Sequence, residues 1–374
     1  MPRSMSLQRL TSVYVGKRDS LNNPSGSFTT AFTAETFNFT EMRELENYAG
    51  VKGRATMAPT AFAPDLTSRM AELSFSGPLT FPHLLIAFNA GLGKKNTSLF
   101  PYRVGASVLT PSNAVNRRIW KWQPPVDASQ EIEYLNLSWR EEASNADTEL
   151  FYINKAFCTS IELESSDSGL CTMSSSYIGG RVNETNFTPS TLIPNMITVP
   201  VKMSSIGFYD SLSAANSADL TDTDSDVSDF KISIDTGHTP LHTKSDNADL
   251  DFTQEIASTR TIMITGNMYG DLNKSIDNHA RFDVERDAGY AGDIRFVKMR
   301  FESPSIIERV EAVPNPYYLE ITVPCYHESD SMMDHGQEDS NGIRLYPFNL
   351  MSTSDIGGGD IDYYIEMANA VDSF

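Results

Sequence analysis

Three aspartates at alternate positions in the stretch DTDSDVSDF have the spacing with which a calcium-binding loop begins. Asp222, Asp224 and Asp226 could each offer a carboxylate oxygen, which is the ligand that calcium prefers. An EF-hand loop also needs glycine at its sixth position and glutamate at its twelfth, where this chain has Val227 and Ser233. The EF-hand interpretation therefore fails. Two alternatives remain: this loop binds calcium in another geometry, or it is an acidic loop exposed to solvent.

A second cluster of possible metal ligands lies in the stretch CYHESDSMMDHGQED, and its members are His327, Glu328, Asp330, Asp334 and His335. It has neither a His-Glu-x-x-His motif nor another standard zinc spacing, so a polar loop after a strand explains it better. The glycines of SDIGGGDID lack the Lys-Ser/Thr pair of a phosphate-binding loop. No Gly-x-Ser-x-Gly elbow or recognisable Cys/His pairing is present. We therefore expect that the protein is not an enzyme and uses no catalytic residue, cofactor or metal.

The stretch RRIWKWQPP places Arg117, Arg118 and Lys121 beside Trp120 and Trp122. Basic residues between aromatic ones can bind single-stranded nucleic acid, but a single such patch on an acidic chain is weak support for that function. We instead expect a contact between subunits, formed by Arg117, Arg118, Trp120 and Trp122, or a half-buried strand.

The net charge of −20 is unevenly distributed along the chain. Residues 1–122 hold 14 Lys and Arg against 7 Asp and Glu, whereas residues 123–374 hold 15 against 42, which gives +7 and −27. An acidic body disfavours binding to DNA phosphates and suits a wall past which DNA slides, although ordinary solubility charge is the simpler explanation. The basic part could contact an acidic neighbour, including another copy of the chain.

The length of 374 residues and the 40% hydrophobic content allow a substantial core in one large domain or two. No run of eighteen apolar residues and no signal-peptide core is present, so we expect a soluble protein without a membrane anchor, made in a cytoplasm. The 3 cysteines cannot form a complete disulfide framework. Cys158 and Cys171 could face each other across a hairpin, but buried thiols are preferred.

The segment FYINKAFCTSIELESSDSGLCTMSSSYIGGRV alternates in its middle. One parity holds Phe157, Thr159, Ile161 and Leu163, and the other holds Cys158, Ser160, Glu162 and Glu164. A period of two predicts a strand with one packed and one solvated face. The turn-forming residues 165–169 and the extended run that follows complete a β-hairpin with a face of Ser, Thr and Glu.

The many strand-like stretches and the single helix-like stretch of the remaining chain predict a mostly β fold. We expect a β-sandwich or barrel-like domain with one short packing helix. The stretch LTFPHLLIAFNAGLG, Leu79 to Gly93, predicts the helix, in which His83 is structural. The sequence predicts an N-terminal arm over residues 1–35 and one domain over residues 36–374, with an acidic loop insertion at about 211–251. Short strands rich in β-branched and aromatic residues follow Lys94.

The order of these elements resembles the major tail tube proteins of long-tailed, siphovirus-like bacteriophages. The helix stretch leads into YRVGASV, the hairpin follows, then NFTPSTLIPN, FESPSIIERVEAVPNPYYLEITVPCY and a closing DYYIEMANAV. Ile178-Gly179-Gly180-Arg181 and Phe187-Thr188-Pro189 fit the family's glycine kink and its exit from the hairpin. The resemblance covers residues 70–200 and 255–374, and it lies in the pattern of elements rather than in an invariant motif.

The resemblance implies a structural virion protein that assembles into hexameric rings, which stack into the hollow tube of a non-contractile tail. Its partners would be other copies of itself, the tape-measure protein, and the tail terminator and distal tail proteins. DNA would pass through without specific binding during genome ejection. The solvated face of the hairpin would line the lumen, where Glu162 and Glu164 would repel phosphates. The protein would be assembled in the host cytoplasm and reside in the virion tail.

Two other functions remain open at this stage. A distal tail or baseplate hub protein would share the sandwich but stop at one or two rings. A calcium- or carbohydrate-binding β-sandwich would be a stable monomer, and the acidic loops with Trp120 and Trp122 motivate it. Strands near Ile294–Phe301 and Tyr317–Cys325 compete with the hairpin for the lumen.

Overall fold

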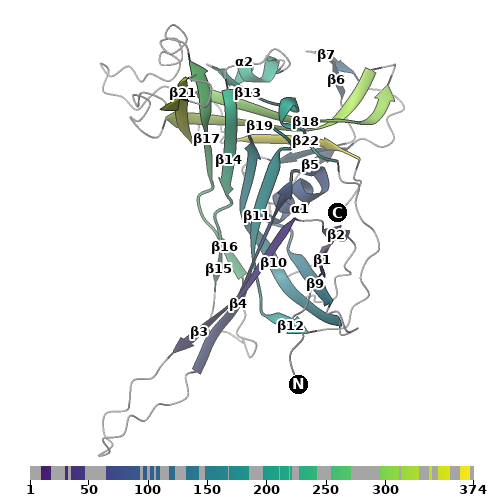
Figure 1. Ribbon diagram of the computed structural model, residues 1–374, viewed down its shortest axis with the longest axis vertical. Coiled ribbons are helices and arrows are strands. Elements are labelled where there is room, and N and C mark those ends of the chain that lie inside the picture. The colour runs from purple at the N-terminus through teal and green to yellow at the C-terminus, as the bar shows by residue number, and fades with distance from the viewer. Residues whose placement is uncertain are drawn as a thin grey trace, which may run out of the picture.

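The computed structural model of the chain is mostly β-structure, as the sequence predicted, with a large antiparallel, barrel-like arrangement of strands (Figure 1). None of the helices in the described part of the chain is long and apolar enough to cross a membrane. The structure describes residues 10–17, 30–32, 35–46, 65–92, 96–98, 102–104, 107–109, 118–122, 132–142, 148–166, 168–184, 197–209, 211–218, 220, 227–241, 254–270, 295–310, 313–327, 337–338, 344–353 and 363–370.

The largest group of strands, which we call sheet I, has the order β3, β4, β11, β10, β14, β17, β21, and each neighbouring pair is antiparallel. The strands are β3 (Thr36–Glu46), β4 (Asp65–Pro78), β11 (Thr172–Gly179), β10 (Thr148–Ser165), β14 (Val227–Asp235), β17 (Thr261–Gly270) and β21 (Arg344–Ser352). The strands β10, β11 and β14 run along the length of the molecule in Figure 1, and the β3–β4 hairpin projects from the body at the lower left.

A second group, sheet II, continues from sheet I where the end of β19 pairs with β21. Its order is β13, β18, β19, β22, β8, β5, again antiparallel throughout. The strands are β13 (Ser204–Tyr209), β18 (Arg295–Val310), β19 (Val313–His327), β22 (Tyr364–Asn369), β8 (Arg118–Trp122) and β5 (Asn96–Ser98). The strands β18, β19 and β22 run across the view in Figure 1, at a steep angle to β14 and β10.

The third group adds strands to the N-terminal half of β10, in the order β2, β1, β9, β10, β12. Its other members are β2 (Thr30–Phe32), β1 (Leu10–Lys17), β9 (Leu135–Glu142) and β12 (Val182–Glu184). The prediction of an arm over residues 1–35 is therefore wrong for β1, which pairs with β9 along its whole length and buries Val13 and Val15. Its partner lies far downstream, so local composition could not reveal the pairing.

The remaining described elements are short. The strands β6 (Tyr102–Val104) and β7 (Ser107–Leu109) form one separate ribbon, and β15 (His238–Leu241) and β16 (Gln254–Ala257) form another. The strand β20 (Gln337–Glu338) pairs with β21. The helix α2 (Leu212–Ser217) is capped by the Ser211 hydroxyl, which accepts a hydrogen bond from the Ala214 N–H at 3.2 Å, and a 3-10 turn η1 (Val201–Met203) precedes β13.

The predicted acidic insertion at 211–251 is wrong for its centre. The strand β14 lies between β10 and β17 in the middle of sheet I, and its side chains Phe230, Ile232 and Ile234 are buried. The alternation of these apolar residues with polar ones outweighs the acidic composition around them, because burial of one face is what fixes a strand in a sheet. Residues 221–226 and 242–253, and with them Asp222, Asp224 and Asp226, lie outside the described residues.

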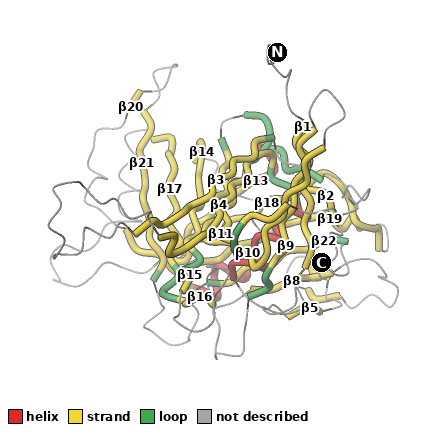
Figure 2. The backbone as a smooth tube through the Cα atoms, turned by 90° about the horizontal axis from the view of Figure 1, so that it is seen from below, coloured by secondary structure: helices red, strands yellow, loops and turns green. Residues whose placement is uncertain are grey.

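The predicted helix is confirmed as α1 (Phe81–Leu92), and it is buried on all sides except at Pro82. Figure 2 shows it in red among the strands in the middle of the molecule. The ring of Phe88 packs 5.0 Å from that of Trp122. Gly91 permits a close approach to the sheet, because a Cβ there would come within 2.7 Å of the Thr236 methyl carbon.

The predicted hairpin is confirmed as β10 and β11, with Ile161 and Leu163 buried and Glu162 and Glu164 on the opposite face. The predicted alternation of buried and solvated residues does not hold before Ser160, because the pairing of β10 with β11 has a register shift between Cys158 and Ser160. Cys158 is consequently buried rather than solvated, and Thr159 is half-buried. All 3 cysteines are free and buried, as preferred from the sequence.

Candidate functional site

The exposed face of sheet I is covered mainly by hydroxyl, amide and carboxylate side chains, and we call it the polar face. Strand register brings these side chains into rows that cross the sheet, since each faces the same side as its directly paired neighbour. Its polar members are Thr36, Asn38, Thr40, Glu72, Ser74, Ser76, Ser160, Glu162, Glu164, Thr172, Ser174, Ser176, Asp229, Lys231, Ser233, Asp235, Thr261, Thr265, Asn267 and Asn349. Apolar residues also occur on this face, namely Pro78, Ile178, Met263, Pro347 and Met351, with Met70, Tyr269 and Leu345 toward its ends and the buried Phe157 opposite Ile178.

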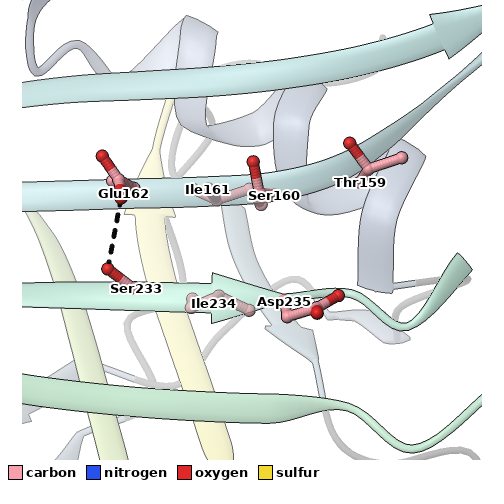
Figure 3. Close-up of a pocket in the computed structure, with 7 residues that line it drawn as sticks. All are labelled: Thr159, Ser160, Ile161, Glu162, Ser233, Ile234 and Asp235. Atoms are coloured by element: carbon pink, nitrogen blue, oxygen red, sulfur yellow. Dashed lines mark hydrogen bonds between the residues drawn. The ribbon is translucent and has the colours of Figure 1, made fainter.

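Glu162 is the hydrogen-bonding centre of the polar face. It accepts a hydrogen bond from the Ser174 hydroxyl of β11 at 3.2 Å and one from the Ser233 hydroxyl of β14 at 3.4 Å. Its Oε1 also lies 3.0 Å from the Nζ of Lys231. Figure 3 shows Glu162 on β10 and Ser233 on β14, joined by this bond. One carboxylate thus links three adjacent strands on their solvent side.

Glu164 lies two residues further along the same face but in a different electrostatic setting. It is exposed, and it is directly opposite Lys231 in the strand register. The lysine nevertheless makes its ion pair with Glu162 on the diagonal. Within the described residues, no hydrogen bond or ion pair engages the Glu164 carboxylate. The two predicted acids therefore share a face, as expected, but only Glu164 has an unpaired charge.

Further carboxylates on the polar face come from β4 and β14, which lie outside the hairpin. Asp229 accepts hydrogen bonds from Ser228 at 2.7 Å and from the Asn267 amide at 2.9 and 3.0 Å. Asp235 accepts one from the Gly237 N–H at 2.9 Å, and Glu72 is exposed on β4. Lys231 is the single cation among the described residues of this face. Alternation within each strand is enough to predict that these acids face solvent. Which acids of different strands lie side by side depends on the strand register.

Two depressions lie on the polar face on either side of the Glu162–Lys231 pair. One, of about 340 Å³, lies between Thr159–Glu162 and Ser233–Asp235 and is shown in Figure 3. The other, of about 370 Å³, is bordered by Glu164, Asp229, Lys231, Asn267 and Asn349. In each depression most of the lining residues carry a hydroxyl, amide or charged group, which suits a hydrated surface better than an apolar ligand.

The predicted contact at Arg117, Arg118, Trp120 and Trp122 needs correction for its aromatic members. Trp120 and Trp122 are 2% and 1% exposed and belong to the hydrophobic core. The Nε1 of Trp120 donates a hydrogen bond to the Asn369 side chain at 2.8 Å. Both rings face inward because β8 pairs with β22 and lies near α1. Arg118 begins β8, and Arg117 lies outside the described residues.

The exposed side of sheet II carries a second set of charges, which we call the charge ladder: Lys121, Lys298, Arg300, Glu302, Glu320 and Glu366. Register places Arg300, Glu320, Glu366 and Lys121 in one row across four strands. Glu320 pairs with Lys298 at 3.2 Å and with Arg300 at 3.5 Å. Arg300 also pairs with Glu302 at 2.8 Å, and Lys121 with Glu366 at 3.1 Å. Each charge in this set has an opposite partner.

Glu366 is held by two tyrosines as well as by Lys121. The hydroxyl groups of Tyr318 and Tyr364 donate to its two carboxylate oxygens, the latter at 2.6 Å. Burial alone would raise the pKa of Glu366, but these hydrogen bonds and the lysine charge outweigh it and hold the pKa below its usual value. The ladder is thus a structural network, partly shielded from water.

Buried histidines serve the fold. His83 on α1 lies 3.1 Å from the Ser175 hydroxyl, and burial lowers its pKa to about 3. Burial, together with the nearby charge of Arg260, lowers the pKa of His238 to about 4. Both rings are therefore neutral at pH 7, which agrees with the structural role expected for His83. Within the described residues, no three His, Cys, Asp or Glu side chains are grouped to hold a metal.

The other stretches considered as metal or phosphate sites fall largely outside the described residues. His327 ends β19, whereas Glu328, Asp330, Asp334 and His335 lie beyond it in an undescribed segment. Gly357–Gly359 are likewise undescribed, so the interpretation of both stretches remains a prediction.

Comparison with known proteins gives no family for this chain, because no protein-family model matches it and no curated protein matches it. The polar face and the strands around it are therefore the features of the molecule that bear on its function.

Proposed function

We propose that this protein is the subunit of a bacteriophage tail tube, which assembles into stacked hexameric rings around a lumen through which DNA leaves the virion. The observation that carries the proposal is the polar face: seven paired strands present hydroxyl, amide and carboxylate groups to one side. The tube would be that of a non-contractile tail and would first enclose a tape-measure protein.

A surface that conducts DNA must stay hydrated and must not bind phosphates. Hydroxyl and amide groups hold water, and carboxylates repel the DNA backbone over a distance of about 8 Å at physiological salt. The polar face combines both properties along several adjacent strands. An ordinary solvent-exposed sheet surface would carry lysines and arginines among its acids, whereas this face has Lys231 alone among its described residues.

Self-assembly is supported by an open strand edge next to the polar face. Within the described part of the chain, β3 is paired only with β4, although it is eleven residues long. Thr36, Asn38, Phe39 and Thr40 of this strand are exposed. Long open edges are templates for another chain, and closing a barrel with a neighbour removes them. A neighbouring subunit that pairs here would extend the polar face around a lumen.

Negative-stain electron microscopy of the purified protein over a concentration series, with light scattering in parallel, tests the proposal. Hollow striated tubes with six-fold rings are the expected result. Assembly that stops at one or two rings would favour a distal tail or hub protein. A compact monomer at every concentration, also in the presence of a tail initiation complex, would contradict the tube function.

A further inference from the structure

We infer that Glu162 acts as a charge mask for Lys231: by pairing with the single described cation of the polar face, it keeps that cation from binding polyanions. The biological meaning of this inference rests on the proposed function, but the masking itself is a property of the folded subunit. It assigns different tasks to the two acids, because Glu162 neutralises a lysine and Glu164 supplies unpaired negative charge.

The geometry of Glu162 favours pairing over projection into solvent. Hydroxyl groups from both neighbouring strands, Ser174 and Ser233, donate to its two oxygens and hold the carboxylate between these strands. In that position Oε1 is 3.0 Å from the Lys231 Nζ. The carboxylate is therefore orientated by the sheet before the lysine contributes.

Lys231 would be available to a polyanion without this partner. Its side chain is 39% exposed, and it borders the depression that also contains Glu164 and Asn267. A lysine on a flat, hydrated sheet can reach a phosphate oxygen, and each such contact releases about one counterion. A surface ion pair contributes little free energy. Glu162 must therefore mask Lys231 by placing a negative charge beside its ammonium group, rather than by binding it tightly.

The test compares two matched substitutions, Glu162→Gln and Glu164→Gln. Both remove one negative charge from the same strand and the same face, and glutamine can still accept hydrogen bonds from the serines. Binding of a short fluorescein-labelled DNA duplex to each purified variant is measured by fluorescence anisotropy over a salt series that begins at low ionic strength.

Glu162→Gln should bind the duplex roughly two- to five-fold more tightly than Glu164→Gln, the range that corresponds to loss of a surface ion pair. Its dependence on salt should be steeper by about 0.9, for one additional phosphate contact. The double variant Glu162→Gln with Lys231→Gln should return to the level of Glu164→Gln or below. Equal behaviour of the two single variants, whether both bind or neither does, overturns the inference.

A second variant covers the case in which Glu162→Gln does not fold. Replacing both Ser174 and Ser233 by alanine removes the groups that orientate Glu162 and leaves the net charge unchanged. This variant should also gain DNA binding, by a smaller factor, and no gain in a folded protein overturns the inference. Neither measurement requires tubes. If Glu162 masks Lys231 in a protein that never polymerises, only the tube function is contradicted. If the protein forms tubes but the two single variants bind DNA equally, only the masking by Glu162 is contradicted.

Discussion

The polar face and the charge ladder are built by the same rule and reach opposite electrostatic states. Both lie on the solvent side of an antiparallel sheet, and in both register brings charged residues from distant parts of the chain into rows. The polar face has five described acids, Glu72, Glu162, Glu164, Asp229 and Asp235, against Lys231. The charge ladder has three acids against three bases, all of them paired.

The difference shows that charge in a sheet can serve two purposes. In the ladder every charge has an opposite partner and several of these pairs tie strands together, so removing a charge should affect folding. On the polar face the carboxylates outnumber their partners, so their removal affects mainly what approaches the surface. Net charge alone, which is −20 for the whole chain, does not distinguish these cases.

The largest effect is expected where the ladder is most buried. Glu320→Gln leaves Lys298, whose side chain is 5% exposed, without its carboxylate, and should lower the free energy of unfolding by about 3 kcal/mol. Urea denaturation followed by circular dichroism measures this. The matched change on the polar face, Glu164→Gln, should stay within about 0.5 kcal/mol. Similar losses for the two variants would remove the distinction between the faces.

A smaller effect is expected from a single hydrogen bond to the ladder. Tyr364→Phe removes the hydroxyl that donates to Glu366 at 2.6 Å, and it should cost about 1.5–2 kcal/mol because the acceptor is charged. The same denaturation experiment applies. Tyr326→Phe is the control, since the Tyr326 hydroxyl donates to the Met351 sulfur, a weak acceptor, and should cost clearly less.

The ladder should also give the protein part of its acid sensitivity. The folded-state pKa of Glu366 lies below its usual value of 4.5, so the stability that this group contributes is complete above that pH. It is lost as the pH falls through the folded-state pKa. Thermal unfolding between pH 6 and pH 3 should therefore show the difference between wild type and Glu366→Gln narrowing below pH 4.5. A constant difference over that range would mean that Glu366 is not the group involved.

A still smaller effect on stability than in the ladder is expected at the centre of the polar face. Glu162→Gln breaks a half-exposed ion pair, which should cost about 0.5–1 kcal/mol in urea denaturation. Sodium chloride should reduce the difference from wild type, because it screens an exposed pair. A loss as large as that of Glu320→Gln would instead show that Glu162 is mainly a structural link between strands.

The sequence was sufficient for elements whose signal is local. The stretch from Leu79 to Gly93 has caps, apolar content and terminal glycines, and it forms α1 within those bounds. Alternation alone placed Glu162 and Glu164 on the solvated face of β10. These predictions depend on a few consecutive residues, and the tertiary structure does not override them.

Features that depend on pairing between distant strands were missed. Lys231 meets Glu162 because β14 pairs with β10 in one register, and no local pattern encodes that register. No local pattern in β1 reveals its pairing with β9, more than a hundred residues downstream. The basic neighbours of Trp120 and Trp122 favour a contact surface or a half-buried strand, whereas both rings lie in the core because alternate residues of β8 face inward.

The strand β10 contains two irregularities, and each of them reverses which alternate side chains face the core. Its pairing is interrupted first between Ile153 and Ala156 and again between Cys158 and Ser160, and the inward parity returns to that of Ile153 by Ile161. Deleting one residue at either interruption would leave a single shift, so Glu162 and Glu164 would point into the core while Ile161 and Leu163 faced solvent. Deleting one residue at each should restore the original alternation. We therefore expect single-residue deletions within β10 to be tolerated only in pairs, one at each interruption.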